Sequence, residues 1–508
     1  MISFLIRRIG TGLATLLVST FVMYLLVSAS MRPFDDLETS TAPNKAQQIA
    51  DRTRDLDLDT PAVLRYFKWL GNFVTGDLGD GWRTGQTVSS MLSGAIVSTV
   101  QLVLLATLLG IVFGVAVGIV SALRQYTTFD YLMIFVSFLL YSLPSFWVAV
   151  LLKQWGAIGF NDFLRDPKLG TGVIVGISLV TGLLWQLAIG GDGRRRLTTF
   201  AIGAAASAAV FFYLDLSDWW SKPQIDLPLL LVLGVASALA ITLLSAGLSN
   251  RRALGAALTT VVVGAIITFP LEAFFKQTPG SWGLIAVLFV VTLAIAAAIG
   301  FAWGGPDRGV SIRTAMLTGL VMSLFIFMDK VMSYWGAYVS APAINGRPIA
   351  TIGDRTPNLG GNFWVQALDT YTHLLLPTLT LVLIGFAGYT RYSRASMLEV
   401  MSQDYIRTAR AKGLPERTVV MRHGFRNSLI PLATIIPIDI ITLLGGAIIT
   451  EQVFGRPGMG TMFIRALRGS EIEPVMAYLV IVGGLAILAN IVADLMYAAL
   501  DPRIRVDA

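Results

Sequence analysis

The chain has 508 residues, of which 55% are hydrophobic and only 14% charged, with a net charge of +7. Soluble domains carry about 25% charged residues, so this composition excludes a soluble globular protein and indicates an all-α polytopic membrane protein. The excess of basic residues is typical of cytoplasmic loops, and we expect no nucleic-acid partner. Because the chain has no cysteine and two histidines, we expect no disulfide and no metal site.

The N-terminal segment resembles a signal peptide, with Arg7 and Arg8 followed by an apolar run. The run from position 9 to 27 is longer than the roughly 7–15 residues of a signal-peptide core, which predicts an uncleaved first span. Eleven further apolar stretches approach the about 20 residues that a helix needs to cross a bilayer. The twelve predicted spans lie near residues 9–30, 95–121, 129–155, 171–190, 197–214, 227–248, 254–273, 282–303, 314–331, 374–390, 428–450 and 475–498.

The charges of the connecting loops predict the topology. Alternate loops are basic, and the loops between them carry mixed charges. Because basic loops stay in the cytoplasm, both the N- and the C-terminus are predicted to be cytoplasmic. The basic positions are 7–8, 124, 194–196, 251–252, 308, 313, several between 391 and 426, 503 and 505.

Two loops predicted to be extracytoplasmic are long. The segment at residues 31–93 has helical character in its first part, and Leu64, Phe67 and Trp69 are expected to lie along the membrane surface. The second, near residues 333–372, is rich in glycine, proline and asparagine. We expect neither to form an independent domain.

The loop at residues 391–427 is the most polar stretch in the second half of the chain. Between positions 391 and 426 it carries eight basic and three acidic residues. Asp404 is expected to cap a helix that starts at Tyr405, Gly413 to end it, and Pro415 to begin a second helix. Ala409, Ala411 and Gly413 have almost no side chain, so another surface can approach the backbone closely. A basic helix of this kind is typical of a docking element, and a plain cytoplasmic loop is the alternative.

Six stretches of the chain together resemble one family. They read FLIRRIGTGLATLL, DLDLDTPAVLRYFKWLGNFVTGDLG, SLPSFWVAVLL, DYIRTARAKGLPERTVVMRHGFRNSLIPL, ITEQVFGRPGMGTMF and NIVADLMYAALDPRIR, and they cover about residues 1–155 and 335–506. In this order they resemble a permease subunit of the peptide-type ATP-binding-cassette importers. The resemblance is to the member of the permease pair that has the long first external segment.

The resemblance implies that the loop at 391–427 is a coupling loop whose helix docks on an ATPase subunit. The importer consensus of Glu-Ala-Ala, three residues and Gly corresponds here to Arg407, Thr408, Ala409 and Gly413, without the glutamate. The expected docking residues are Asp404, Tyr405, Arg407, Thr408, Ala409, Ala411, Gly413, Leu414 and Pro415.

The resemblance also implies the partners of the chain. They are two ATPase subunits or one fused pair, which bind ATP and Mg²⁺, a second related permease, an extracytoplasmic solute-binding protein and the lipid bilayer. The implied location is the bacterial inner membrane, as a multi-pass protein. The chain lacks the G-x-x-x-x-G-K-[ST] phosphate loop. We therefore expect no catalytic residue and no cofactor in this chain.

The family core has about six spans, so about six are extra. We divide the chain into a first core part at 1–160, an inserted transmembrane module at 161–331 and a second core part at 332–508. An even number of inserted spans leaves the topology of the core unchanged. The insert has few charges within its spans, which favours a packing module over a second channel.

Two residues are candidates for the substrate path. Asp439 is an ionisable residue within a predicted span, and such residues usually face a cavity or pair with a neighbour. Phe146 follows Pro144 and is expected to contact either substrate or lipid.

Two other functions remain as alternatives. A stand-alone secondary transporter of about twelve spans often shows similar halves and midplane charges, both lacking here. An intramembrane enzyme would require paired catalytic residues within spans.

Overall fold

The computed structural model describes residues 2–38, 41, 43–305 and 308–500. Within these residues the molecule is helical and has no β-strand beyond one isolated bridge, between Asp80 and Thr87. Eleven of the described helices are long and apolar enough to cross a bilayer, and one bent pair makes a twelfth if it is counted as a single span. These findings confirm the prediction of an all-α polytopic fold with about twelve spans.

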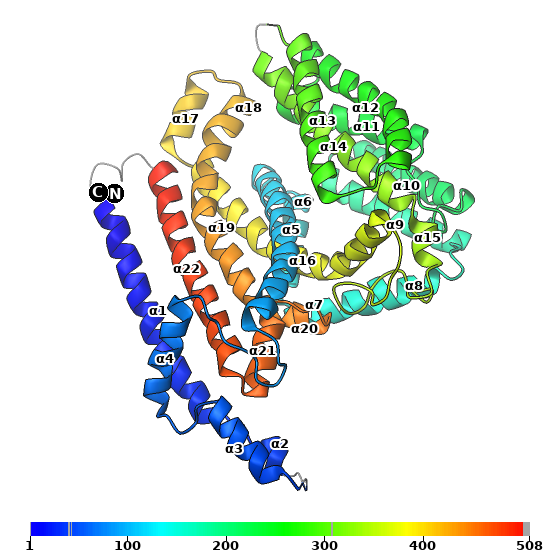
Figure 1. Cartoon of the computed structure of the whole chain (residues 1–508). Helices are drawn as coiled ribbons and strands as arrows, with labels where there is room; N and C mark the ends of the chain where they lie inside the picture. The colour runs from blue at the N-terminus through cyan, green and yellow to red at the C-terminus, as the bar shows by residue number, and fades with distance from the viewer. Residues whose placement is uncertain (1, 39–40, 42, 306–307, 501–508) are drawn as a thin grey trace.

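The first part of the core is a long helix, an amphipathic external segment and a second long helix. Tyr66 and Trp69 of the external segment are buried against Tyr24 of the first helix. The segment therefore packs along the outer end of that helix (Figure 1). The elements are α1 (Ile2–Ser30), α2 (Asp35–Glu38), α3 (Lys45–Asp55), α4 (Ala62–Val74) and α5 (Val88–Leu123).

The span predicted at 129–155 is present as a pair of helices with a sharp bend between them. The chain bends by 101° where Leu143 and Pro144 separate two helices. Proline has no backbone N–H to donate and keeps the preceding residue extended, and Leu143 has a ψ of 131°. The elements here are α6 (Thr128–Ser142), α7 (Ser145–Leu151), the π-helical η1 (Leu152–Gly159) and α8 (Phe160–Phe163).

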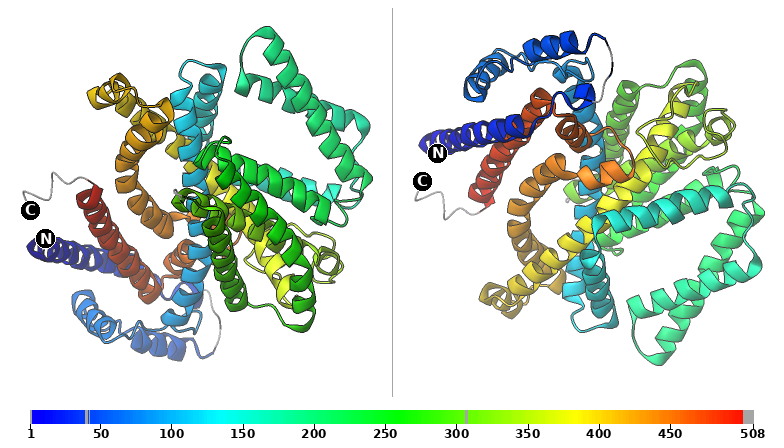
Figure 2. Two further views of the ribbon diagram at one scale, coloured as in Figure 1. Left: turned by 90° about the horizontal axis from the view of Figure 1, so that it is seen from above. Right: turned by 90° about the horizontal axis from the view of Figure 1, so that it is seen from below.

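The next six helices lie beside the core in both views of Figure 2, and α9 and α10 form a hairpin at the edge. Helices α11 to α14 form a bundle in which small residues allow close approach. At Gly300, for example, a Cβ atom would lie 2.5 Å from the Cα of Ile312. The elements are α9 (Thr171–Ile189), α10 (Gly193–Leu216), α11 (Leu227–Ser245), α12 (Arg251–Gln277), α13 (Trp282–Trp303) and α14 (Arg308–Met332).

The last part of the chain returns to the core. Helix α16 packs along α5, and α22 packs beside α1, where Arg8 and Asp494 form an ion pair of 2.9 Å (Figure 1). The elements are α15 (Trp335–Val339), α16 (Phe363–Met401), α17 (Asp404–Ala411), α18 (Glu416–Thr418), the π-helical η2 (Val419–Phe425), α19 (Arg426–Gly446), α20 (Ile448–Val453), α21 (Met459–Gly469) and α22 (Ile472–Leu500).

Contacts between loops place the predicted cytoplasmic loops on one side. Arg124 donates to the carbonyl of Ala188 at the end of α9 over 3.0 Å, and Arg417 donates to that of Leu244 at the end of α11 over 2.8 Å. Arg417 belongs to the loop at residues 391–427, which carries α17 and α18 at the top of Figure 1, and we call this loop the docking loop. That this side is the cytoplasm stays a prediction, and positions 503 and 505 lie outside the described residues.

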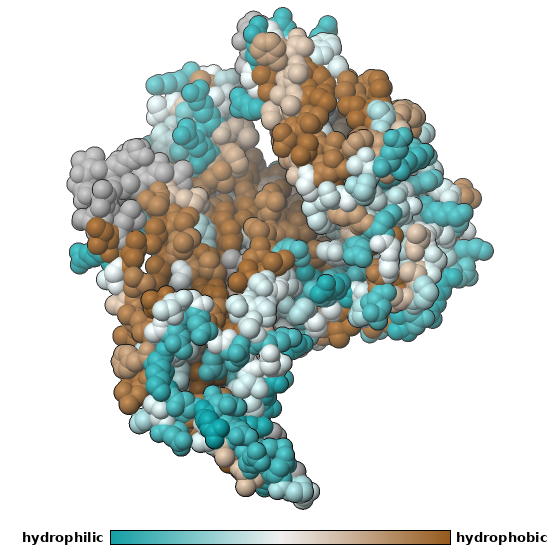
Figure 3. All heavy atoms as spheres, in the orientation of Figure 1, coloured by the Kyte–Doolittle hydropathy of each residue, from teal (hydrophilic) through white to brown (hydrophobic). Residues whose placement is uncertain are grey.

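The surface agrees with a membrane location. Apolar side chains cover the core helices and α13 in Figure 3, whereas hydrophilic residues gather over the external segment and around α17. Val287, Val290 and Phe301 of α13 expose more than half of their surface. Such a continuous apolar face is stable only when lipid or another apolar surface covers it.

Candidate functional site

The docking loop is anchored at its base to the core. Arg394, near the end of α16, forms a two-pronged ion pair with the buried Asp130 of α6, with N–O distances of 2.7 and 2.9 Å. Ser121 of α5 donates to the same carboxylate over 2.5 Å. Ser396 donates to the carbonyl of Ser428 over 2.9 Å, which joins α16 to α19. These contacts join the base of the loop to α6 and α19.

Helix α17 begins one residue earlier than predicted. Its N-cap is Gln403, so Asp404 lies in the first turn and does not cap the helix. In that position the carboxylate still faces the positive end of the helix dipole, and it lies 3.5 Å from Arg407. The exposed side chain of Asp404 is thus available to a partner.

The inner face of α17 packs against η2. Ile406, Ala409 and Val419 form a small buried cluster with Met401 beside it. Only 6% of Ala409 is exposed, so its methyl group supports the loop from inside. This buried cluster gives the loop a shape of its own outside the spans.

The turn after α17 has the predicted form. Gly413 has a φ of +74°, in the left-handed region that favours glycine, and its N–H donates to the carbonyl of Arg410 over 2.9 Å. Pro415 then precedes α18 as its N-cap. Across the turn the guanidinium of Arg410 donates to both oxygens of Glu416, at 2.7 and 3.1 Å. This contact holds the two short helices together.

The exposed side of the loop is the candidate site. Tyr405 and Leu414 expose 42% and 38% of their surface, and Ala411 is exposed between them in sequence. The surface combines small and apolar residues with basic side chains, and it projects beyond the ends of α16 and α19 in Figure 1. We call it the docking face and define it as Asp404, Tyr405, Arg407, Thr408, Ala411, Gly413, Leu414 and Pro415.

The two candidate path residues lie on different elements. Asp439 lies on α19 and is half-buried. Phe146 lies on α7, beyond the bend at Pro144, and exposes 49% of its surface. The structure thus places the two residues on different helices, and their part in a substrate path stays a prediction.

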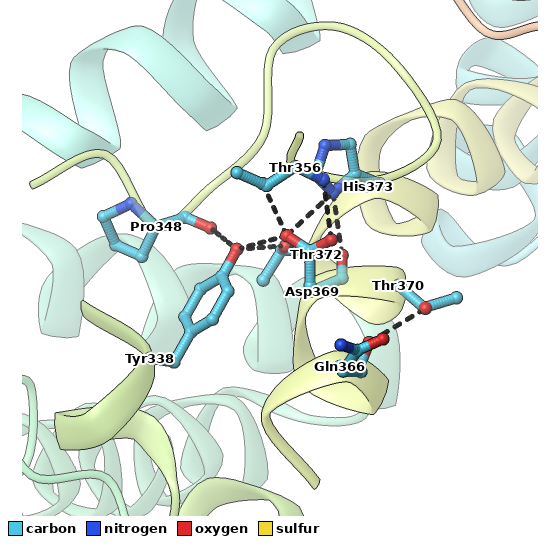
Figure 4. A network of polar contacts seen from close by, with 8 residues as sticks. All are labelled: Tyr338, Pro348, Thr356, Gln366, Asp369, Thr370, Thr372 and His373. Atoms are coloured by element: carbon cyan, nitrogen blue, oxygen red, sulfur yellow. Dashed lines mark hydrogen bonds and ion pairs between the residues drawn. The ribbon is translucent and has the colours of Figure 1, made fainter. Parts of the chain in front are cut away.

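A buried polar network at the start of α16 was missed by the sequence analysis (Figure 4). Tyr338 of α15 donates to Asp369 over 3.2 Å and shares a hydrogen bond of 2.9 Å with Thr372. Thr356 donates to Asp369 through both its hydroxyl and its N–H, at 2.6 and 2.8 Å. The spacing of Asp369, Thr372 and His373 places them on one face of a helix, and this pattern could have indicated the network. The network fastens the second external segment to α16.

A second buried group lies in the stretch ITEQVFGRPGMGTMF. The carboxylate of Glu451 accepts from Thr99 of α5 over 2.6 Å and from the N–H of Thr461 over 2.9 Å. Arg456 is 1% exposed, and burial lowers the pKa of its guanidinium while the carboxylates of Asp354 and Glu451 oppose this effect. These contacts tie α5, α20 and α21 together at the outer end of the core.

Comparison with known proteins shows the family to which this chain belongs. Residues 110–506 match the family of binding-protein-dependent transport system inner membrane components. The chain belongs to this family. It is therefore a multi-pass inner-membrane protein and a transport-system component, and this membership confirms the resemblance to importer permeases.

Individual permeases of this family match parts of the chain. The oligopeptide transport system permease protein OppB of Mycobacterium tuberculosis is 38% identical over 208 residues, which are 40% of this chain and 64% of the relative. AppB of Bacillus subtilis, also an oligopeptide permease, is 44% identical over 136 residues, 27% of this chain and 43% of the relative. The dipeptide permease DppB of Escherichia coli is 36% identical over 203 residues, which are 37% of this chain and 59% of the relative. The chain thus spans less than two thirds of each relative.

These permeases are named as transport-system subunits, and neither the family nor the relatives support a stand-alone secondary transporter. Their description as permease proteins also agrees with a chain that is not itself an enzyme.

Proposed function

We propose that this chain is the membrane-spanning permease subunit of an ATP-driven importer for peptides or similar small solutes. In this proposal it forms the translocation path with a second related permease. Two ATPase subunits or one fused pair bind ATP and Mg²⁺, and an extracytoplasmic solute-binding protein delivers the solute. The relatives compared above are oligopeptide and dipeptide permeases, which supports this class of substrate.

The observation that carries the proposal is the docking face. It is exposed, it projects beyond the spans, and its base is fixed to α6 and α19 by Arg394 and Ser396. A loop built only to connect two spans needs neither a buried cluster of its own nor a two-pronged ion pair at its root. A lever between an ATPase and the spans needs both.

Helix α16 would transmit the motion. It has 39 residues, about 58 Å at 1.5 Å per residue, and it runs from the Asp369 network to the base of the docking loop. Closure of the ATPase subunits on ATP would shift the docking face, and α16 and α19 would follow as one unit. The spans would thereby change between inward-open and outward-open states, while the hydrolysis takes place in the partner chains.

The test is co-purification from native membranes with a tag on this chain, followed by an ATPase and uptake assay. Ala411→Trp adds a bulky side chain to the docking face, at an exposed helical position. Gly413 is unsuitable because its φ of +74° strains any other residue. The matched control is Thr198→Trp, an exposed position near the start of α10 on the same side of the molecule.

We expect the ATPase chains to co-purify with wild type and with Thr198→Trp. Ala411→Trp should either lose them or retain hydrolysis without uptake. If the wild-type chain purifies alone and transports without ATP, the proposal is wrong.

A further inference from the structure

The module predicted as an insert encloses a cavity that the transport proposal does not use. The cavity has a volume of about 870 Å³ and lies among α11, α12, α13 and α14, with Trp364 of α16 at one end. This volume falls within the range of about 300–1,000 Å³ that is typical of small-molecule sites. Most of the lining is apolar, with Phe289, Ile295 and Met322 among the wall residues.

The depth of the cavity corresponds to one leaflet of a bilayer. Along α14 the lining runs from Gly319 to Lys330, a separation of 11 residues or about 16 Å of helix. Half of the hydrocarbon core of a bilayer is about 15 Å. The lining reaches the side where α11 and α13 begin and where α12 and α14 end, which is the predicted extracytoplasmic side, and we call this part the outer end of the cavity.

One cation, Lys330, lies at this outer end. The ammonium of Lys330 lies 5.4 Å from the ring centre of Tyr334, 5.8 Å from that of Phe275 and 5.9 Å from that of Trp364. The rings hold the ammonium by cation–π attraction. Across the described part of the chain Lys330 forms no ion pair within 4 Å, so its charge is available to an anionic group.

Three carboxylates line the same end. Asp329 accepts from the N–H of Ile225 over 2.8 Å, Asp226 accepts from the N–H at the start of α11, and Glu272 pairs with Lys276 at 3.1 Å. Each carboxylate has free acceptor positions beyond these bonds. The outer end of the cavity therefore offers one cationic and three anionic partners, and the rest of the cavity, which we call the apolar shaft, is lined mostly by apolar side chains.

We propose that this cavity binds one zwitterionic phospholipid of the phosphatidylethanolamine type. The acyl chain fills the apolar shaft, the phosphate faces Lys330, and the primary ammonium donates to Asp329 and Glu272. Phosphatidylglycerol has a net negative charge, which the carboxylates would repel. Phosphatidylcholine has a quaternary ammonium, which has no N–H to donate to them. The proposal does not depend on the transport function.

The site has a structural consequence. Trp364 stands at the beginning of α16, the helix that carries the docking loop at its other end. A lipid in the cavity contacts both the inserted bundle and this residue. It would therefore fasten the module to the core.

The test is native mass spectrometry of the complex purified in detergent. The complex is titrated with phosphatidylethanolamine, phosphatidylglycerol and phosphatidylcholine that carry identical acyl chains. Ser323→Trp fills the shaft, with Leu317→Phe, an exposed α14 position outside the lining, as its control. Lys330→Gln removes the cation, with Lys222→Gln, exposed in the loop before α11 and outside the lining, as its control.

We expect one tightly held phosphatidylethanolamine per chain, with affinity at least about tenfold above that for the other two lipids. Ser323→Trp should abolish it and Lys330→Gln should weaken it about tenfold, while both controls bind as wild type. Equal binding of the three lipids, or unchanged binding in both cavity variants, would show only general lipid contact and overturn the proposal. Recovery of a peptide from the cavity would also overturn it.

Discussion

Asp130 shows how a single buried charge holds the base of the docking loop. Its carboxylate is 1% exposed, and three donors satisfy it, from Arg394, Ser121 and the N–H of Tyr126. A buried ion needs such compensation because leaving it unpaired costs several kcal/mol. Removing the charge of Asp130 or of Arg394 therefore leaves the other charge without its ion-pair partner, which destabilises the folded protein.

Asp130→Asn should destabilise the protein by about 3 kcal/mol, because Arg394 is left without its charged partner. Thermal unfolding in detergent measures the change. The control is Asp162→Asn, which removes an exposed pair with Arg165 at 3.6 Å and should change stability by less than about 1 kcal/mol. Equal shifts in the two variants would contradict the account.

Asp57 gives the external segment a pH response. Hydrogen bonds from Lys68, at 2.6 Å, and from Thr60, at 2.7 Å, hold the pKa of this carboxyl below its ordinary value of 3.8. A lowered folded pKa means that the contribution to stability is complete above pH 3.8 and is lost as the pH falls through the folded value.

Lys68→Met should move the pKa of Asp57 back toward 3.8, so the junction of α3 and α4 should loosen at a higher pH than in wild type. Hydrogen exchange of residues 56–60, corrected for the intrinsic pH dependence, measures the midpoint. The same midpoint in both proteins would show that Lys68 does not set the pKa. Lys45→Met, at the start of α3, serves as the control.

The sequence predicted local features, such as turns, better than it predicted contacts between residues far apart in the chain. The glycine at 413 was identified correctly because turn chemistry is local, and the proline at 415 lies one residue before α18, as its N-cap, and not in its first turn. The cap at 404 was wrong by one residue, since Gln403 takes that position. Nothing in the sequence near Asp130 indicates that its partner lies 264 positions away, at Arg394.

At the scale of elements, hydropathy located every span but not its shape. The stretch at 129–155 is apolar on average, so a hydropathy window alone does not show the 101° bend, whereas the proline at 144 indicates one. Similarly, Ala409 was expected to face a partner because it is small, but its side chain is packed against Val419 within the loop. Which face of a short helix is exposed depends on the tertiary contacts of its neighbours.

The contact of Arg417 with α11 connects the docking loop to the inserted bundle. Its guanidinium donates to the carbonyl of Leu244 over 2.8 Å, at the negative end of the α11 dipole. Arg417→Ala should increase hydrogen exchange of residues 246–250 by about fivefold, because about 1 kcal/mol of local stabilisation is lost. Lys412→Ala, exposed in the same loop, is the control and should leave this exchange unchanged.

Unchanged exchange in Arg417→Ala would show that the bundle and the loop are independent. The division of the chain into a core and a module at 161–331 stays a prediction that this comparison helps to test.

At the scale of the whole molecule, the alternation of basic loops predicts one orientation. The chain has no cysteine, so a single introduced thiol reports its own position. Gln277→Cys, at the end of α12, should react with a membrane-impermeant maleimide in spheroplasts. Ser249→Cys, in the loop before α12, should react only after permeabilisation. The reverse pattern would invert the topology and place the docking face outside.

The central claim is that the docking face contacts an ATPase. The most direct measurement is cross-linking of Ala411→Cys in native membranes with a short thiol-to-amine reagent, followed by mass spectrometry of the adduct. The account predicts an adduct with an ATPase subunit whose yield changes with ATP, and none from Thr198→Cys. Full transport activity without any ATPase adduct from position 411 would contradict it.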